Sequence, residues 1–175
     1  AELYTKKALD INPEEFESYF TIMLGHIIQN QHDKAEEILA ELLEEPLGNP
    51  DRDRSIALAC FFLDKFEPGL ERALSAVEMD PLNRRNALAQ FIAYYYCEKF
   101  SEAIKVFESE YGEFGEFDLN PFGWGVVINC YANNGQSDRA RVSLDNLLMT
   151  YPQLTASELE KSIFFTDEKS KDKYL

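Results

Sequence analysis

The chain has 175 residues, of which 45% are hydrophobic, and its 17 Lys and Arg against 32 Asp and Glu give a formal net charge of −15. This composition is that of a folded protein, large enough for one buried core or for an array of small units. The excess of negative charge excludes nucleic acid and anionic membrane as expected partners, because a strongly acidic surface repels both.

In chain order, small residues recur at intervals of 34, 34, 34 and 37 residues. Four of them follow a polar or turn-forming stretch and lead into apolar residues at helical spacing. Two helices of about 14 residues and a short turn fill 34 positions, and a small residue lets the two helices cross closely. The recurring residues are Ala1, Ala35, Gly69, Ala103 and Ala140.

This period predicts an array of helix pairs over residues 1–152. Because one pair is too small to bury its own apolar face, stacked neighbours must cover it, and we expect an all-α fold, a right-handed α-solenoid of antiparallel helix pairs. Three additional residues with Gly112 and Gly115 predict a local irregularity before the last unit. The expected units are 1–13 (partial), 16–47, 50–81, 84–114 and 121–152.

The last unit resembles the tetratricopeptide repeat (TPR) over its whole length. The family pattern of Trp, Leu, Gly, Tyr, then Gly, Ala, Phe, Ala and Pro is matched by Trp124, Val127, Ile128, Tyr131, Gly135, Ala140, Leu144, Leu147 and Pro152. The departures are Ile128 for Gly, Leu144 for Phe and Leu147 for Ala, which predict slightly wider helix packing. The earlier units are more degenerate but keep the phase. The resemblance implies a protein-interaction scaffold whose concave groove is lined by the first helix of each pair.

Residues 153–175 change character and are expected to form C-terminal capping helices. Thr155 followed by Glu158 is a capping-box signature, and Thr166 with Asp167 can cap a second helix. Such helices would cover the apolar surface that the last repeat leaves open. A TPR array with this ending also resembles C-terminal regulatory regions of bacterial nucleotide cyclases and transcription regulators. That resemblance implies the regulatory part of a larger protein.

The chemistry-bearing residues indicate no enzyme. Cys60, Cys97 and Cys130 are far apart and form no CxxC pair, so we expect no zinc site, no disulfide framework, no cofactor and a reduced, cytoplasmic setting. No nucleotide-binding, metalloprotease, hydrolase or calcium motif is present. His26 is expected on the packing side of its helix and His32 in a solvated turn. The longest apolar stretch is shorter than the ~18–20 residues that a membrane helix needs.

Carrying the family's groove positions onto this sequence gives a mainly apolar and aromatic wall. Arg54 and Arg85 are expected as isolated positive charges that meet a carboxylate of the partner, and Asn129 and Asn133 as hydrogen-bonding groups for its backbone. TPR domains that hold acidic chaperone tails use Lys and Asn instead, so that class of partner is not expected. The candidate partner-binding residues are Phe20, Leu24, Arg54, Leu58, Phe62, Arg85, Leu88, Ile92, Tyr96, Asn129 and Asn133, with Ile28 among the further groove positions.

Three alternatives stay open. The groove aromatics can pack between helices, with the chain's tail or a neighbouring domain filling the groove. The solenoid edges and apolar face can instead pair symmetrically and form a homodimer. The alternative of another class is an enzyme or small-molecule sensor with a pocket near Trp124, Tyr95 and Arg85. Reversible binding of a protein or peptide segment, at micromolar strength, is the interpretation we favour.

Overall fold

The computed structural model describes residues 16–111 and 119–155, and within these ranges every regular element is an α-helix. The predicted all-α fold is therefore confirmed. The partial unit at 1–13, the irregularity around Gly112 and Gly115 and the capping helices after 155 lie outside the described residues. The helices are α2 (Phe16–Ile28), α3 (His32–Leu43), α4 (Pro50–Phe62), α5 (Phe66–Met79), α6 (Arg84–Tyr96), α7 (Phe100–Tyr111), α8 (Pro121–Asn133) and α9 (Ser137–Thr150).

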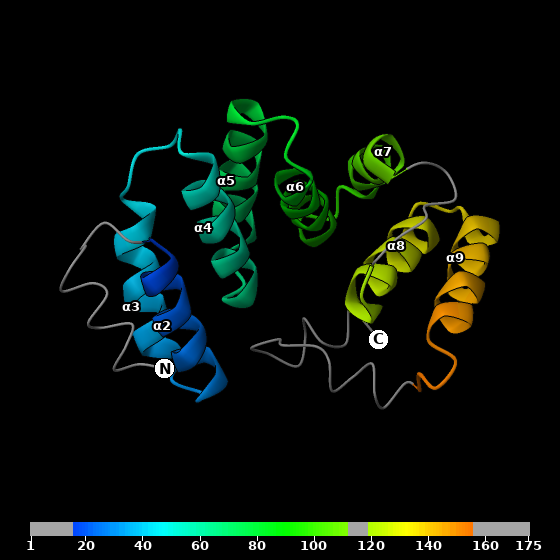
Figure 1. The fold of residues 1–175 in the computed structure, drawn as a ribbon, viewed down its shortest axis with the longest axis horizontal. Helices are drawn as coiled ribbons and strands as arrows, with labels where there is room; N and C mark the ends of the chain where they lie inside the picture. The colour runs from blue at the N-terminus through cyan, green and yellow to red at the C-terminus, as the bar shows by residue number, and fades with distance from the viewer. Residues whose placement is uncertain (1–15, 112–118, 156–175) are drawn as a thin grey trace. The chain divides into compact units, whose positions relative to one another are not determined.

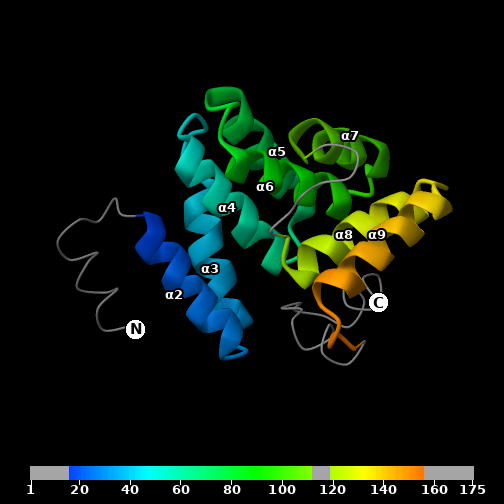
Figure 2. The same ribbon diagram turned by 45° about the vertical axis from the view of Figure 1, so that its right-hand side comes forward.

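The chain groups into two compact units, residues 1–89 and 90–175, and the division falls within α6. In the first unit α2 packs against α3 and α4, and α4 packs against α5. In the second unit α7 packs against α8, and α8 packs against α9. Within the units, α2 and α3 lie side by side (Figure 1), as do α8 and α9 (Figure 2).

The turn inside each helix pair has the same backbone geometry four times. One residue adopts a positive φ, and the next residue donates its N–H to the carbonyl five residues earlier, as Gln31 does to His26 at 2.8 Å. This is the Schellman motif, which satisfies carbonyls at the end of the first helix. The residues with positive φ are Asn30, Asp64, Glu98 and Gly135, with φ of 58°, 56°, 57° and 75°.

The small residues of the 34-residue period lie where the second helix meets the first. Ala35 and Ala103 are fully buried. At Gly69 a Cβ atom would lie 2.6 Å from a ring carbon of Phe61 and 2.9 Å from the Cβ of Cys60, so α5 approaches α4 more closely than alanine permits. The recurring small residues are thus buried, and at Gly69 the approach leaves no room for a side chain.

Asparagine begins three of the first helices. Asn49 accepts a hydrogen bond from the N–H of Arg52 at 3.0 Å, and Asn120 accepts one from the N–H of Gly123 at 2.9 Å. Each of these two caps is followed by a proline in the first turn, where no backbone donor is needed. Asn83, before α6, accepts from the N–H of Arg85 at 3.1 Å.

First and second helices differ in how much of their circumference is apolar. The second helix α3 buries only Ala35, Leu39 and Leu42, along one face. The first helix α4 buries side chains on most of its circumference, including Ile56, Ala57, Ala59, Cys60 and Phe61. A helix that buries side chains on several sides is covered by several neighbours, which for α4 are α2, α3 and α5.

A buried ion pair fastens the first unit. The guanidinium of Arg72 on α5 donates to Asp53 on α4 at 2.8 Å and to the carbonyl of Leu43 at the end of α3 at 2.8 Å. Asp53 also accepts from the N–H of Gly48 and the hydroxyl of Ser75, each at 2.8 Å. The sequence pattern did not indicate this network, because neither residue belongs to the repeat pattern.

Candidate functional site

Two rows of side chains on α2 and α4 form the candidate site, which we call the first-helix face. Phe20, Leu24 and Ile28 stand four residues apart on α2, and Leu58 and Phe62 continue the same spacing on α4. Phe20, Leu24, Leu58 and Phe62 are partly exposed and Ile28 is 71% exposed. Residues four apart share one side of a helix, so each row is a continuous apolar strip.

The strips lie beside a packed core. Met23 of α2 and Ile56, Ala59 and Cys60 of α4 are buried in one cluster with α3, and Phe20 packs against its margin. Each of these first helices therefore has a buried side and a partly exposed apolar side. We take the partly exposed apolar side as the candidate surface for another molecule to cover.

Arg54 heads the row on α4, but it is not the isolated charge that the sequence predicted. Its guanidinium is hydrogen bonded to Asp51 at 2.6 Å and to Asn86 on α6 at 3.1 Å, and only 14% of its side chain is exposed. Asn86 is itself fully buried and donates to the carbonyl of Ala76 at 3.0 Å. Arg54 therefore fastens α4 to α6 and is partly neutralised.

The candidate residues on α6 divide into exposed and buried ones. Arg85 is exposed and Leu88 is partly exposed, so both are accessible. Ile92 and Tyr96 are only 9% and 6% exposed, and Tyr96 packs edge-to-face against Tyr95 with the ring centroids 5.2 Å apart. These two side chains are core residues, in line with the alternative that groove aromatics pack between helices.

Asn129 and Asn133 on α8 direct their amide donors to their own helix. The side-chain NH₂ of Asn129 donates to the carbonyl of Gly125 at 3.1 Å, and that of Asn133 to the carbonyl of Asn129 at 2.9 Å. Each side-chain NH₂ therefore uses one of its two hydrogens within its own helix.

The thiols and imidazoles are arranged as structural groups. Burial raises the pKa of Cys60 and of Cys130 to about 12, so neither is a thiolate nucleophile near neutral pH. The imidazole of His26 is hydrogen bonded to the side chain of Gln31, and that of His32 to the side chain of Asn30, each at 2.8 Å. Among the described residues, no three His, Cys, Asp or Glu side chains are grouped to hold a metal ion.

The side-chain burial does not favour the alternative of a ligand pocket near Trp124, Tyr95 and Arg85. Trp124 and Tyr95 are 4% and 2% exposed, so both are core residues, and burial raises the pKa of Tyr95. An open cavity of about 420 Å³ is instead lined by residues 150–154 at the end of α9.

Within the described helices, none is both long and apolar enough to cross a bilayer.

Comparison with known proteins identifies the fold. No family model matches the sequence, and no curated protein does either. Among solved structures, the crystal structure of MamA is similar, with a TM-score of 0.56, 14% sequence identity and coverage of 85% of each chain. MamA is a TPR-like helical repeat protein, so this likeness supports the TPR-like fold.

Proposed function

We propose that the protein binds a segment of another protein on the first-helix face, as a non-catalytic scaffold. The observation that carries this proposal is the pair of apolar strips, Phe20, Leu24 and Ile28 on α2 and Leu58 and Phe62 on α4, beside a buried core against which Phe20 packs. Covering such strips removes apolar area from water at roughly 25 cal/mol per Å². Much of that gain is offset by association and ordering costs, so reversible micromolar binding is expected.

The chemistry of the face selects the kind of segment. A partner needs apolar side chains at helical or alternate spacing to cover the strips. Because the chain carries a net charge of −15, basic residues flanking the apolar ones favour encounter. Arg54 is partly neutralised by Asp51, so a terminal carboxylate is not the main recognition element.

The regulatory role is part of the same proposal. A segment-binding scaffold fused to an effector domain, such as a bacterial cyclase or transcription regulator, would pass on the binding event to that domain. We also propose a cytoplasmic setting for the protein. The buried thiols of Cys60 and Cys130, which form no disulfide, are compatible with that setting.

The test is selection of 15-residue peptides from a displayed library against the whole chain, followed by fluorescence anisotropy. We expect enriched apolar peptides with basic flanks and a micromolar Kd. A carboxylate placed in the strips by Leu58→Asp or Ile28→Asp should weaken binding by about 10-fold to 100-fold. Met79→Asp is the control, since Met79 is 56% exposed at the end of α5. The proposal would be refuted if the selection enriched no peptide, or if the enriched peptides bound the wild type and all variants with the same affinity.

A further inference from the structure

The two strips of the first-helix face offer a partner no hydrogen-bonding group. Their five side chains contain only carbon and hydrogen, and from Ile56 to Leu63 the chain has no side-chain nitrogen or oxygen. Between Ile22 and Ile28 on α2 the polar side chain is that of His26, which is partly buried and hydrogen bonded to Gln31 at 2.8 Å. The backbone groups within both helices are bonded along their own helix axes. A segment laid on the strips therefore finds no donor or acceptor there for its own backbone.

The polar side chains at the head of the α4 strip are bonded within the protein. The guanidinium of Arg54 donates to Asp51 at 2.6 Å and to Asn86 at 3.1 Å. The hydroxyl of Ser55 donates to the backbone carbonyl of Asp51 at 2.9 Å. These groups fix the start of α4 and its contact with α6, so they do not replace the hydrogen-bonding groups that the strip lacks.

The last first helix, α8, has a different chemistry at the same repeat positions. Where α4 has Leu58 and Phe62, α8 carries Asn129 and Asn133. An amide side chain both donates and accepts, so it can bond to the backbone of an extended segment. The α4 strip thus lacks a capacity that the same fold provides elsewhere in the chain.

This difference decides between two forms of partner segment. An extended segment on the strips places some of its N–H and C=O groups against apolar side chains, which takes them out of water without a bond in return. A helix bonds its own backbone and presents side chains alone. We propose that the occupant of the first-helix face is an amphipathic helix of the partner, an inference that rests on the proposed function.

The length of the strips sets the spacing of the partner's anchors. Phe20 and Ile28 are eight residues apart on α2, which is roughly 12 Å along the helix axis. The helices α2 and α4 pack against each other, so the two strips run along neighbouring helices. A partner helix laid along them covers this length with apolar residues at i, i+4 and i+7 or i+8, which share one side of that helix.

Charge defines the rest of the partner helix. The strips are uncharged, but they belong to a chain with a net charge of −15. At the head of the α4 strip the side chain of Asp51 is 78% exposed, whereas that of Arg54 is only 14% exposed. Lys and Arg beside the apolar anchors therefore complement the surroundings of the face. The partner segment is a basic amphipathic helix.

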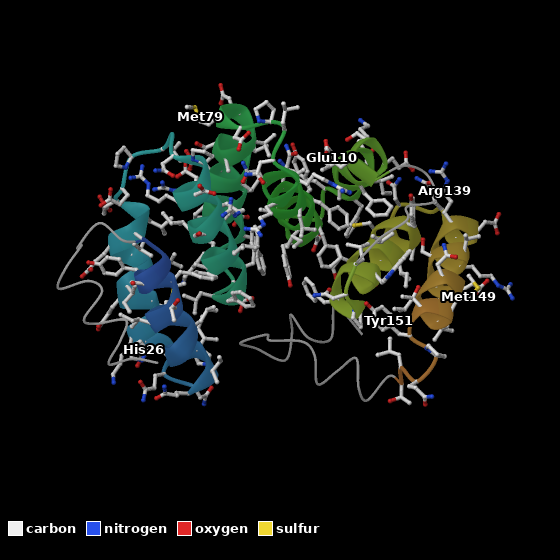
Figure 3. All side chains as sticks on the ribbon, in the orientation of Figure 1. His26, Met79, Glu110, Arg139, Met149 and Tyr151 are labelled. Carbon is white, nitrogen blue, oxygen red and sulfur yellow. The ribbon has the colours of Figure 1, made fainter. Side chains whose placement is uncertain are left out.

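Two displayed libraries of equal composition, selected against the whole chain, test the proposal. Both contain peptides of about 15 residues with four leucines and the same mixture elsewhere, but one library spaces the leucines at i, i+4, i+7 and i+11 and the other at alternate positions. We expect enrichment from the helically spaced library alone. Leu58→Asp and Ile28→Asp should weaken the enriched peptides by at least about tenfold. Met79→Asp should not, since Met79 lies on α5, well apart from His26 of α2 (Figure 3).

Proline in the enriched peptides separates a helix from an extended segment. At a central position that is not a leucine, proline removes a helix hydrogen bond and should weaken binding by at least about tenfold. Before the first leucine, in the first turn of the helix, it should change the Kd by less than about twofold. The far-ultraviolet circular dichroism of the complex, less that of its components, should show added helix.

Every outcome decides between this inference and its rivals. Alternately spaced peptides that depend on Leu58 and Ile28, binding that survives a central proline, or no added helix would overturn the helix and leave the proposed function standing. Peptides that ignore both aspartate variants count against the first-helix face itself. If neither library is enriched, both proposals fail, and a doubled mass in sedimentation that Leu58→Asp abolishes would make a second copy the occupant.

Discussion

The two units join their successive helices with different chemistry. In residues 1–89 the junction of α3, α4 and α5 centres on Arg72 and Asp53, whose side chains are 5% and 0% exposed. In residues 90–175 aromatic rings join α6, α7 and α8: Phe107 lies 5.7 Å from Phe91 and 6.5 Å from Tyr131 between centroids. An ion pair is present there too, between Arg139 and Glu108, but it is 41% and 32% exposed.

The difference shows which features the repeat determines. Ala73 in α5 and Phe107 in α7 stand at the same repeat position, and both are buried. The turns and small residues therefore fix where the helices run, whereas the side chains that fill each junction vary between pairs. Polar networks in one junction and rings in another are compatible with the same helix geometry.

The largest expected effect comes from breaking the buried ion pair. Arg72→Met leaves the Asp53 carboxylate buried without its counter-ion and should cost about 3–5 kcal/mol in the free energy of unfolding. Arg139→Met, which breaks the exposed pair, should cost only about 0–1 kcal/mol. Urea denaturation followed by circular dichroism measures both.

A second substitution separates the charge from the packing. Adding Asp53→Leu to Arg72→Met removes the stranded carboxylate, so the double variant should recover much of the loss. Comparable losses for Arg72→Met and Arg139→Met, or no recovery in the double variant, would show that the two junctions do not differ in the way described.

A smaller effect is expected where the two helices of a pair cross. Gly69→Ala places a Cβ within 2.6 Å of Phe61, so the gain in helix propensity is outweighed and the unfolding free energy should fall by about 1–3 kcal/mol. Gly25→Ala has nothing within 4 Å of the new atom and should raise stability by about 0.5–1 kcal/mol. Calorimetry on both variants should give opposite shifts in Tm; shifts of one sign would contradict the crossing geometry.

The fold was predictable because its signals are periodic. The small residues at 35, 69, 103 and 140 report a close helix crossing, and no other feature of the sequence requires that spacing. The Arg72 and Asp53 pair was not predictable, because it occurs in one junction and joins residues 19 positions apart. A single, non-repeated contact leaves no trace in a periodic pattern.

The candidate site was predictable only in part. Spacing indicated which side chains share a side of a first helix, and the rows through Leu24 and Leu58 are partly exposed. Spacing did not show how deeply each residue lies, so Ile92 and Tyr96, at the positions of Leu58 and Phe62 in the preceding pair, are core residues. The bond from Arg54 to Asn86 depends on a contact between α4 and α6 that sequence spacing does not reveal, whereas Asp51, three residues before Arg54 on α4, is at a spacing at which helical side chains meet.

The smallest expected effect concerns the turn that all the described pairs share. Glu98 adopts φ 57°, a region that disfavours side chains with a Cβ, whereas the last pair has Gly135 at this position. Glu98→Gly should therefore raise the unfolding free energy by about 1 kcal/mol, and Gly135→Ala should lower it by a similar amount. Urea denaturation of the two variants gives both values. If Glu98→Gly is destabilising, the side chain of Glu98 contributes more to the junction than its backbone strain costs, and the four turns are alike in geometry but not in energy.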